Sequence, residues 1–296
     1  MKFSYIIRTL NEETYLEELL SSLMNQDINN HEFEIIVVDS GSTDRTLSIC
    51  RSNEKVNLVE ISKSEFTFGK SLNIGCDAAK GDILFFISGH CVPTNIHWAA
   101  SLSRDLIEKG VSYSFGRQIG RGTTKFSEDT IFFDNFPNRD LSKTGEVGFF
   151  CNNANAAILK SCWLKNKFDE EITGLEDLML AKKIVENGGF ISYHKDAVVF
   201  HIHDETYGQI RNRYYREAIA LKKIFPEVHF TAINFISYFF KSCIKDIRRN
   251  ASISIKFSIL YSIILFRLSQ FFGTFQGYKH HRELSNRMRD KFFYKK

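Results

Sequence analysis

Two stretches decide the fold: residues 5–23, YIIRTLNEETYLEELLSSL, and residues 33–46, FEIIVVDSGSTDRT. Each begins with an apolar run of strand length, and the first continues with leucines at 16, 19, 20 and 23, the spacing of one helical face. Working outward, residues 57–61 and 83–87 are strand-like, and residues 71–79 are typical of a helix that stops at Gly81. Apolar strands that alternate with helices are typical of a mostly parallel sheet covered on both faces.

The second half of the chain is more mixed. It predicts strands at 154–159 and 197–201, a helix at 176–187 and a basic helix at 209–224. From residue 232 onward, runs of Ile, Phe, Leu and Ser are separated by Lys and Arg. The run without charge at 257–266 has ten residues, whereas a membrane span needs about 20. We therefore expect these helices either to lie in a membrane interface or to form a lid on the main domain.

Charge is unevenly distributed along the chain. The net charge is +4, but residues 241–296 contain thirteen Lys and Arg against three acids, so the rest of the chain is acidic. A basic tail favours an anionic partner, either a membrane or a nucleic acid. The six cysteines include no C-x-x-C pair and predict reduced structural thiols, and the first residues do not have the pattern of a signal peptide.

Polar residues follow the first two strands, where ligands of parallel sheets bind. They are Thr9, Asn11, Glu12, Asp39, Ser40 and Ser42. A carboxylate here can accept hydrogen bonds from a ribose or a base, and hydroxyls with loop N–H groups can hold phosphates. Helix capping explains Asn11, Ser42 and Asp44 equally well, but not Asp39 at the end of a buried strand. The chain contains neither G-x-G-x-x-G after its first strand nor a P-loop sequence.

The quoted stretches resemble the start of the family 2 glycosyltransferases, an inverting group with a GT-A fold. The resemblance continues in the family's order through 66–93 (FTFGKSLNIGCDAAKGDILFFISGHCVP), 151–158 (CNNANAAI), 174–189 (GLEDLMLAKKIVENGG) and 198–206 (VVFHIHDET). The chain is most similar to bacterial rhamnosyltransferase-like members that build surface polysaccharide. The resemblance implies an α/β protein, with a GT-A-type, mostly parallel sheet sandwiched by helices at 1–228 and a basic, amphipathic helical extension at 229–296.

The resemblance also implies a catalytic base. In the family, an acidic pair at the start of the helix 176–187 takes the proton of the acceptor hydroxyl, usually through its second member, which is Asp177 here. Glu176 then lies beside the acceptor or holds the helix. Without the resemblance, the helix dipole alone explains acids in a first helical turn.

Further residues are predicted to bind the nucleotide sugar. Lys70 and Asn73 fall in a segment that lies beside the donor in the family; Lys70 neutralises a diphosphate or is a solvated lysine at a helix start. Asn152, Asn153 and Asn155 either contact a sugar through their amides or form a turn before a strand.

One motif departs from the family. Ser88, Gly89 and His90 stand where the family has Asp-x-Asp, whose carboxylate ligates Mg²⁺ or Mn²⁺. Three interpretations are open: His90 replaces the aspartate as a metal ligand, it contacts the diphosphate without a metal, or the enzyme is impaired. If His90 is a ligand, its imidazole suits Mn²⁺ better than Mg²⁺. His201 and His203 have the spacing of one strand face, and one of them is expected to approach the metal.

Together these features predict an inverting glycosyltransferase that moves a sugar from UDP or dTDP to a glycan hydroxyl in capsule or O-antigen synthesis. The expected partners are the donor, a glycan or lipid-linked acceptor and, through the C-terminal helices, a membrane surface, but no nucleic acid. The expected location is cytoplasmic, peripheral on the inner membrane. The alternative is a non-catalytic nucleotide-sugar or glycan-binding protein that has lost Asp-x-Asp.

Overall fold

The computed structural model describes residues 1–141, 147–249 and 257–280, which divide into two compact units. The first unit comprises Met1–Arg121, Asn135–Glu171 and Glu176–Ile202, and the second comprises Gly122–Asp134, Ile172–Leu175 and His203–Lys296. The predicted domains, 1–228 and 229–296, stay a prediction, since the compact units place residues 203–228 with the C-terminal helices.

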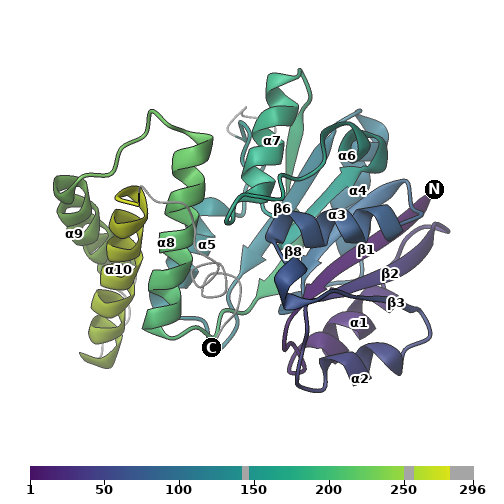
Figure 1. The fold of residues 1–296 in the computed structure, drawn as a ribbon, viewed down its shortest axis with the longest axis horizontal. Helices are drawn as coiled ribbons and strands as arrows, with labels where there is room; N and C mark the ends of the chain where they lie inside the picture. The colour runs from purple at the N-terminus through teal and green to yellow at the C-terminus, as the bar shows by residue number, and fades with distance from the viewer. Residues whose placement is uncertain (142–146, 250–256, 281–296) are drawn as a thin grey trace. The chain divides into compact units, whose positions relative to one another are not determined.

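Among the described residues, the first unit contains all eight strands and most of the shorter helices (Figure 1). In chain order they are β1 (Lys2–Thr9), α1 (Leu16–Met24), β2 (Glu32–Asp39), α2 (Thr46–Arg51), β3 (Val56–Glu60), a short 3-10 helix (Lys63–Glu65), α3 (Phe68–Ala78), β4 (Ile83–Ser88), β5 (Cys91–Pro93), α4 (Trp98–Glu108), β6 (Tyr113–Ile119), β7 (Asn155–Leu159), α6 (Lys160–Asn166), α7 (Glu176–Glu186) and β8 (Ile191–His201).

The strands form one mixed sheet in the order β3-β2-β1-β4-β7-β6-β8-β5. The pairs among β3, β2, β1 and β4, and the pair β6–β8, are parallel, whereas β7 and β5 pair antiparallel with their neighbours. The predicted α/β class is confirmed, with antiparallel strands that the sequence did not predict. The register pairs Thr9 with Asp39 and Arg8 with Ser88, so these strand ends meet at one edge.

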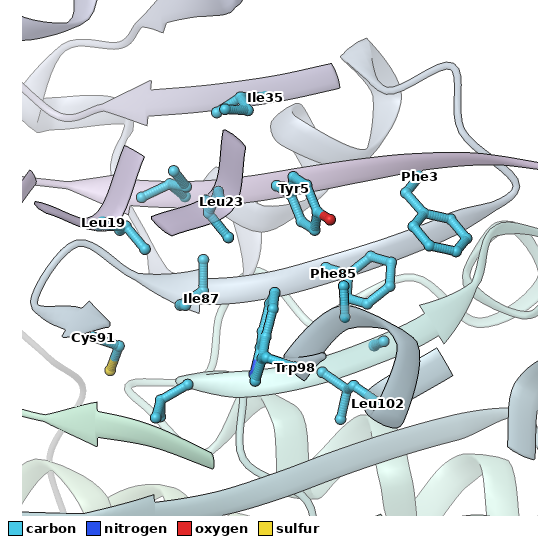
Figure 2. Packing of buried hydrophobic residues seen from close by; sticks show 14 of the residues in the cluster. Phe3, Tyr5, Leu19, Leu23, Ile35, Phe85, Ile87, Cys91, Trp98 and Leu102 are labelled. Atoms are coloured by element: carbon cyan, nitrogen blue, oxygen red, sulfur yellow. The ribbon is translucent and has the colours of Figure 1, made fainter. Parts of the chain in front are cut away.

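Helices α1, α2 and α4 cover one face of the sheet, as their shared hydrophobic cluster shows. Its centre is aromatic: the Trp98 ring lies 5.7 Å from Phe85 and 6.0 Å from Tyr5, and Figure 2 shows it close to Phe85 among the other buried side chains. Helix α3 packs on the other face, where a Cβ at Gly75 would lie 2.6 Å from Ile6. The helix can approach the strands closely because this position has no side chain.

The second unit is helical and consists of α5 (Phe126–Asn135, all but its last residue), α8 (Tyr207–Ile224), α9 (Ala232–Arg249) and α10 (Phe257–Tyr278). Helix α10 lies between α8 and α9 (Figure 1). Its contact with α8 is close, since Cβ atoms at Gly273 and Gly277 would lie 2.3 and 2.4 Å from the backbone oxygens of Arg211 and Tyr215.

A buried ion pair joins two helices of the second unit. Arg267 of α10 donates to both carboxylate oxygens of Asp246 of α9, at 2.6 and 2.8 Å, and Ser127 of α5 donates to the same carboxylate. Arg267 lies inside α10, which is 22 residues long, and its charge is paired there with Asp246. By length and composition alone this helix could cross a membrane, which the run of ten uncharged residues did not predict.

Candidate active site at the carboxyl ends of the strands

Asp39 organises the loop that follows β2. Its Oδ1 accepts the N–H groups of Gly41 and Ser42 at 2.9 and 2.8 Å, and its Oδ2 accepts the hydroxyls of Thr9 and Ser42 at 2.8 and 2.6 Å. A carboxylate offers about four acceptor positions, so the protein engages all of them here. Asp39 is 1% exposed and therefore shapes this edge of the sheet, whether or not it also meets a nucleoside.

The loops after β1 and β2 are tied to each other. Asn11 has a left-handed φ of 56°, donates its N–H to the Ser42 hydroxyl at 2.8 Å and accepts the N–H of Thr43 at 2.8 Å. Glu12 donates its N–H to the Thr46 hydroxyl at 2.8 Å, and the Ser40 hydroxyl donates to the Thr9 carbonyl. Asn11 thus joins two loops and does not cap α1, although Asp44 does accept the first-turn N–H of Thr46 in α2.

Arg8 brings the acidic pair to the same edge. Its Nη1 donates to Glu176 Oε1 at 3.0 Å and to the Phe68 carbonyl at 3.1 Å, and its guanidinium lies 5.2 Å from the Phe68 ring centre. Glu176 is buried, so this pair lies in surroundings where charge is weakly screened. The sequence placed Arg8 at the carboxyl end of a buried strand but gave it no role.

Asp177 is 8% exposed and is held by the backbone. Its Oδ2 accepts the N–H of Asn153 and its Oδ1 accepts the N–H of Leu178, both at 2.8 Å. Burial and the neighbouring Glu176 carboxylate raise the pKa of Asp177 to about 7, against the opposing effect of these bonds and of Arg8. A carboxylate with a pKa near neutrality can accept and release a proton at working pH, as a general base requires.

The chain is strained directly before this pair. Leu175 has a left-handed φ of 57°, a conformation that costs a non-glycine residue about 1 kcal/mol or more. Strained backbone persists where surrounding structure requires it, which is common at functional sites. The strained backbone at Leu175 is therefore consistent with a functional role of the adjacent Glu176 and Asp177.

His90 and His201 form a stacked pair in the first unit. Their ring centres are 5.3 Å apart at an angle of 22°, with His90 Nδ1 2.9 Å from Glu12 Oε1 and His201 Nδ1 2.6 Å from Gln118 Oε1. A Cβ at Gly89 would lie 2.7 Å from Glu12 Cγ, so the glycine leaves room for this arrangement. Metal-ligating histidines usually have the second ring nitrogen held in this way, so the pair fits a divalent cation bound through Nε2.

His203 lies beyond the end of β8, and its predicted role at a metal stays a prediction. Strand β8 ends at His201, so the alternation of side chains along a strand, on which the predicted shared face depended, does not extend to His203. His203 belongs to the second unit, where its Nδ1 lies 2.8 Å from Glu128 Oε1. Burial lowers the pKa of His203, so its neutral form is favoured there.

Glu128, His203 and Glu205 form a second group that could hold a metal ion, with ligand atoms within 4.8 Å of one another. Arg213 already bonds both carboxylates, at 2.7 Å to Glu128 and 2.9 Å to Glu205. Burial would raise the pKa of Glu128, but Arg213 and His203 outweigh it and lower the value to about 2. The guanidinium thus supplies the positive charge that these acids need, and a divalent ion beside it would be repelled.

Two predicted ligand residues have packing roles instead. Asn73 donates to the Phe168 carbonyl and to Glu170, and its oxygen accepts from Trp163 and the Phe168 N–H, so all its hydrogen-bonding capacity is used. Asn155 is fully buried, accepting from Trp98 and donating to the carbonyls of Arg117 and Ala197. A sequence shows that an amide is present but not whether the protein already satisfies it.

The remaining predicted residues differ in position. Asn153 accepts from the Tyr113 hydroxyl and donates its backbone N–H to Asp177, which ties it to the acidic pair. Asn152 accepts from Gln118, the residue that holds His201. Lys70 lies half-buried in the first turn of α3, where its N–H donates to Thr67.

The fold and the residues at the carboxyl edge of the sheet together indicate the class of protein. Solved structures that resemble the chain include the mannosyltransferase PcManGT from Pyrobaculum calidifontis in complex with GDP-Man and Mn²⁺, with a TM-score of 0.64 at 17% identity over 93% of this chain and 86% of that one. The chain thus has the GT-A fold of the glycosyltransferases. Residues 4–161 match glycosyl transferase family 2, and the chain belongs to that family.

The curated relatives that the chain resembles are named glycosyltransferases. The poly(ribitol-phosphate) beta-N-acetylglucosaminyltransferase TarS of Staphylococcus aureus is 43% identical over 91 residues, which are 29% of this chain and 16% of that protein. The O-antigen chain rhamnosyltransferase RfbN of Salmonella typhimurium is 23% identical over 227 residues, 73% of this chain and 71% of that protein. The match therefore spans about a sixth of TarS and most of RfbN.

Proposed function

We propose that the chain is an inverting glycosyltransferase that transfers a sugar from a nucleoside diphosphate donor to a glycan hydroxyl of a bacterial surface polysaccharide. The observation that carries the proposal is Asp177, a buried carboxylate with a pKa near neutrality, in the first helical turn beside Glu176, which Arg8 ties to the strand ends. Membership of the family and the relatives that act on wall polymers and O-antigen support the substrate class.

Asp177 acts as the general base. It takes the proton of the acceptor hydroxyl as that oxygen attacks the anomeric carbon, and the bond from that carbon to the diphosphate oxygen breaks on the opposite side. The nucleoside diphosphate leaves with the bonding electrons, so configuration inverts. The N–H groups of Asn153 and Leu178 hold both carboxylate oxygens, which fixes the base in one orientation.

Arg8 and Glu176 position the base. The Glu176 carboxylate accepts from Arg8 and, beside Asp177, raises the pKa of Asp177. A base with a pKa near 7 is deprotonated in a large fraction of molecules at working pH, and it still accepts a proton more strongly than an ordinary carboxylate does. Glu176 thus supplies electrostatic tuning without touching the reacting atoms.

The donor lies over the loops that Asp39 organises. Ser40, Ser42 and the loop N–H groups are proposed to meet the nucleoside, with UDP or dTDP as the donor class, and Lys70 to meet the diphosphate. His90 and His201 would hold a divalent ion, Mn²⁺ or Mg²⁺, that neutralises the diphosphate when bound; Glu12 and Gln118 orient the two rings. The role predicted for His203 stays a prediction.

The acceptor is proposed to be a growing glycan on a lipid carrier. This would place the chain at the cytoplasmic face of the inner membrane, as a peripheral protein. The basic excess of residues 241–296 supports this location, since anionic lipids attract basic segments.

The second candidate is a non-catalytic nucleotide-sugar-binding protein, which the replacement of Asp-x-Asp by Ser88, Gly89 and His90 favours. Both candidates bind a nucleotide sugar, but only the glycosyltransferase converts it to product. Thermal unfolding with UDP- and dTDP-sugars, with and without Mn²⁺, identifies the donor, because a ligand of the folded state raises its melting temperature. Sugar transfer or slow donor hydrolysis then shows catalysis.

The test of the base is Asp177→Asn. We expect transfer to fall by about 10²–10⁴-fold, the usual contribution of a general base, while the donor still raises the melting temperature. An asparagine amide would meet the N–H of Asn153 or Leu178 as a second donor, so unfolding of the variant must be measured beside Glu186→Gln at the far end of α7. Near-normal transfer by a folded Asp177→Asn variant would remove the base assignment.

A further inference from the structure

Helix α9 of the second unit presents an apolar stripe to solvent. Its large side chains, spaced three or four residues apart, share one side of the helix, and they are 79, 54, 58 and 47% exposed at Ile233, Ile236, Phe240 and Ile244. The opposite side packs within the unit, where Phe235 lies 6.1 Å from the Phe275 ring of α10 and Asp246 bonds Arg267. The stripe is therefore a feature of a helix that is already docked, not of an unpacked one.

Positive charge borders this stripe. Lys241 and Arg248 are exposed on its flank and have no ion pair among the residues that the structure describes. The other basic residues of α9 are engaged, Lys245 with Asp134 and Arg249 with Asp129. The one acid of the helix, Asp246, is buried with Arg267, so the outward side of α9 combines apolar side chains with uncompensated positive charge.

Helix α10 has the length to cross a membrane, but its packing argues against it. It contacts α8 so closely that a Cβ at Gly273 or Gly277 would overlap the α8 backbone, and α8 carries charged residues such as Arg213. Crossing the bilayer would either separate the two helices or draw these charges into hydrocarbon. A helix held in this way stays with its unit at the membrane surface.

We propose that the stripe of α9, bordered by Lys241 and Arg248, docks the second unit onto an anionic lipid bilayer. The apolar side chains enter the boundary between headgroups and acyl chains, and the two cations face lipid phosphates. Self-association of two copies through this stripe is disfavoured, because a two-fold contact would bring the same cations together. The inference rests on the proposed membrane location and not on the chemistry of the first unit.

The test is sedimentation of the full chain with vesicles of equimolar phosphatidylglycerol and phosphatidylcholine, or of phosphatidylcholine alone. We expect salt-sensitive binding to the anionic vesicles. The variant I236S/F240S should lose roughly tenfold or more in vesicle binding, and K241Q/R248Q a similar factor on anionic vesicles only. The matched control is L164S/K165Q on α6, an exposed leucine and lysine of the first unit, which should bind as the native chain does.

Several outcomes would overturn the docking surface. These are no binding to anionic vesicles, equal loss in the control and the stripe variants, or retention on vesicles after a high-salt and alkaline wash that removes peripheral proteins. Conversion of a dimer to a monomer by I236S/F240S, without vesicle binding, would assign the stripe to a second copy instead. Transfer to a soluble acceptor, measured separately, reports on the proposed function, so the failure of either proposal is visible alone.

Discussion

At the scale of single residues, two buried carboxylates at one edge of the sheet have different partners. Asp39 receives four hydrogen bonds, whereas Asp177 receives two N–H bonds and has an acidic neighbour. Donors stabilise the charged form of a carboxyl, while burial and a like charge destabilise it. The same side-chain type therefore organises a loop at one position and can accept a proton at the other.

This contrast predicts a pH dependence. With a pKa of about 7, Asp177 is increasingly protonated as the pH falls, so the rate constant of transfer should fall on the acid side of neutrality. Glu176→Gln removes the neighbouring negative charge that raises this pKa, and should shift the acid limb to lower pH. The measurement is kcat against pH for both proteins. Glu186→Gln at the end of α7 is the control, and an acid limb that Glu176→Gln leaves in place would contradict the assignment.

Sequence reasoning found the strand-end residues but not all of their roles. Thr9, Asn11, Asp39 and Ser42 are brought together because parallel strands end at one edge, which the apolar runs predicted. The role of Arg8 was missed because a single basic residue has no spacing pattern that shows its partner, which lies 168 residues away in sequence.

At the scale of elements, apolar periodicity predicted where strands occur but not their direction. Residues 154–159 were expected as a strand and form β7, yet β7 pairs antiparallel with β4 and β6. Residues 91–136, for which the sequence predicted no element, contain β5, α4, β6 and α5. A short strand such as β5 has only three residues, too few for any periodicity to show.

The contact between α8 and α10 predicts an unusual effect of alanine. Gly→Ala in a helix interior normally stabilises by up to about 1 kcal/mol. At Gly277 the new Cβ would lie 2.4 Å from the Tyr215 carbonyl and 2.6 Å from Ala218, so we expect Gly277→Ala to destabilise by about 1–3 kcal/mol. The control is Gly208→Ala in α8, whose Cβ meets nothing closer than 3.9 Å and should be neutral or stabilising. Urea unfolding of both variants decides; a stabilised Gly277→Ala would mean that the helices are not in this close contact.

At the scale of the whole molecule, composition and packing divide the chain differently. The change in composition near residue 230 predicted a boundary after residue 228, while the compact units group α8 with α9 and α10. The physical reason is that α8 has a basic, polar composition but packs one side closely on α10, where a Cβ at Gly277 would lie 2.6 Å from Ala218. Composition reports the average of a segment, and only contacts show which of its sides is covered.

The two divisions predict different behaviour of a chain that ends at residue 228. If residues 1–228 were a self-sufficient domain, this chain would unfold as the full protein does. The structure leads us to expect a loss of roughly 3 kcal/mol or more, the cost of removing large buried side chains such as Phe266, together with binding of an apolar fluorescent dye to the uncovered side of α8. Denaturant unfolding measures the loss, and a chain ending at residue 280, which keeps α9 and α10, is the matched control. Equal stability of the two shortened chains, with no dye binding, would restore the boundary at residue 228 and assign α9 and α10 to a separate extension.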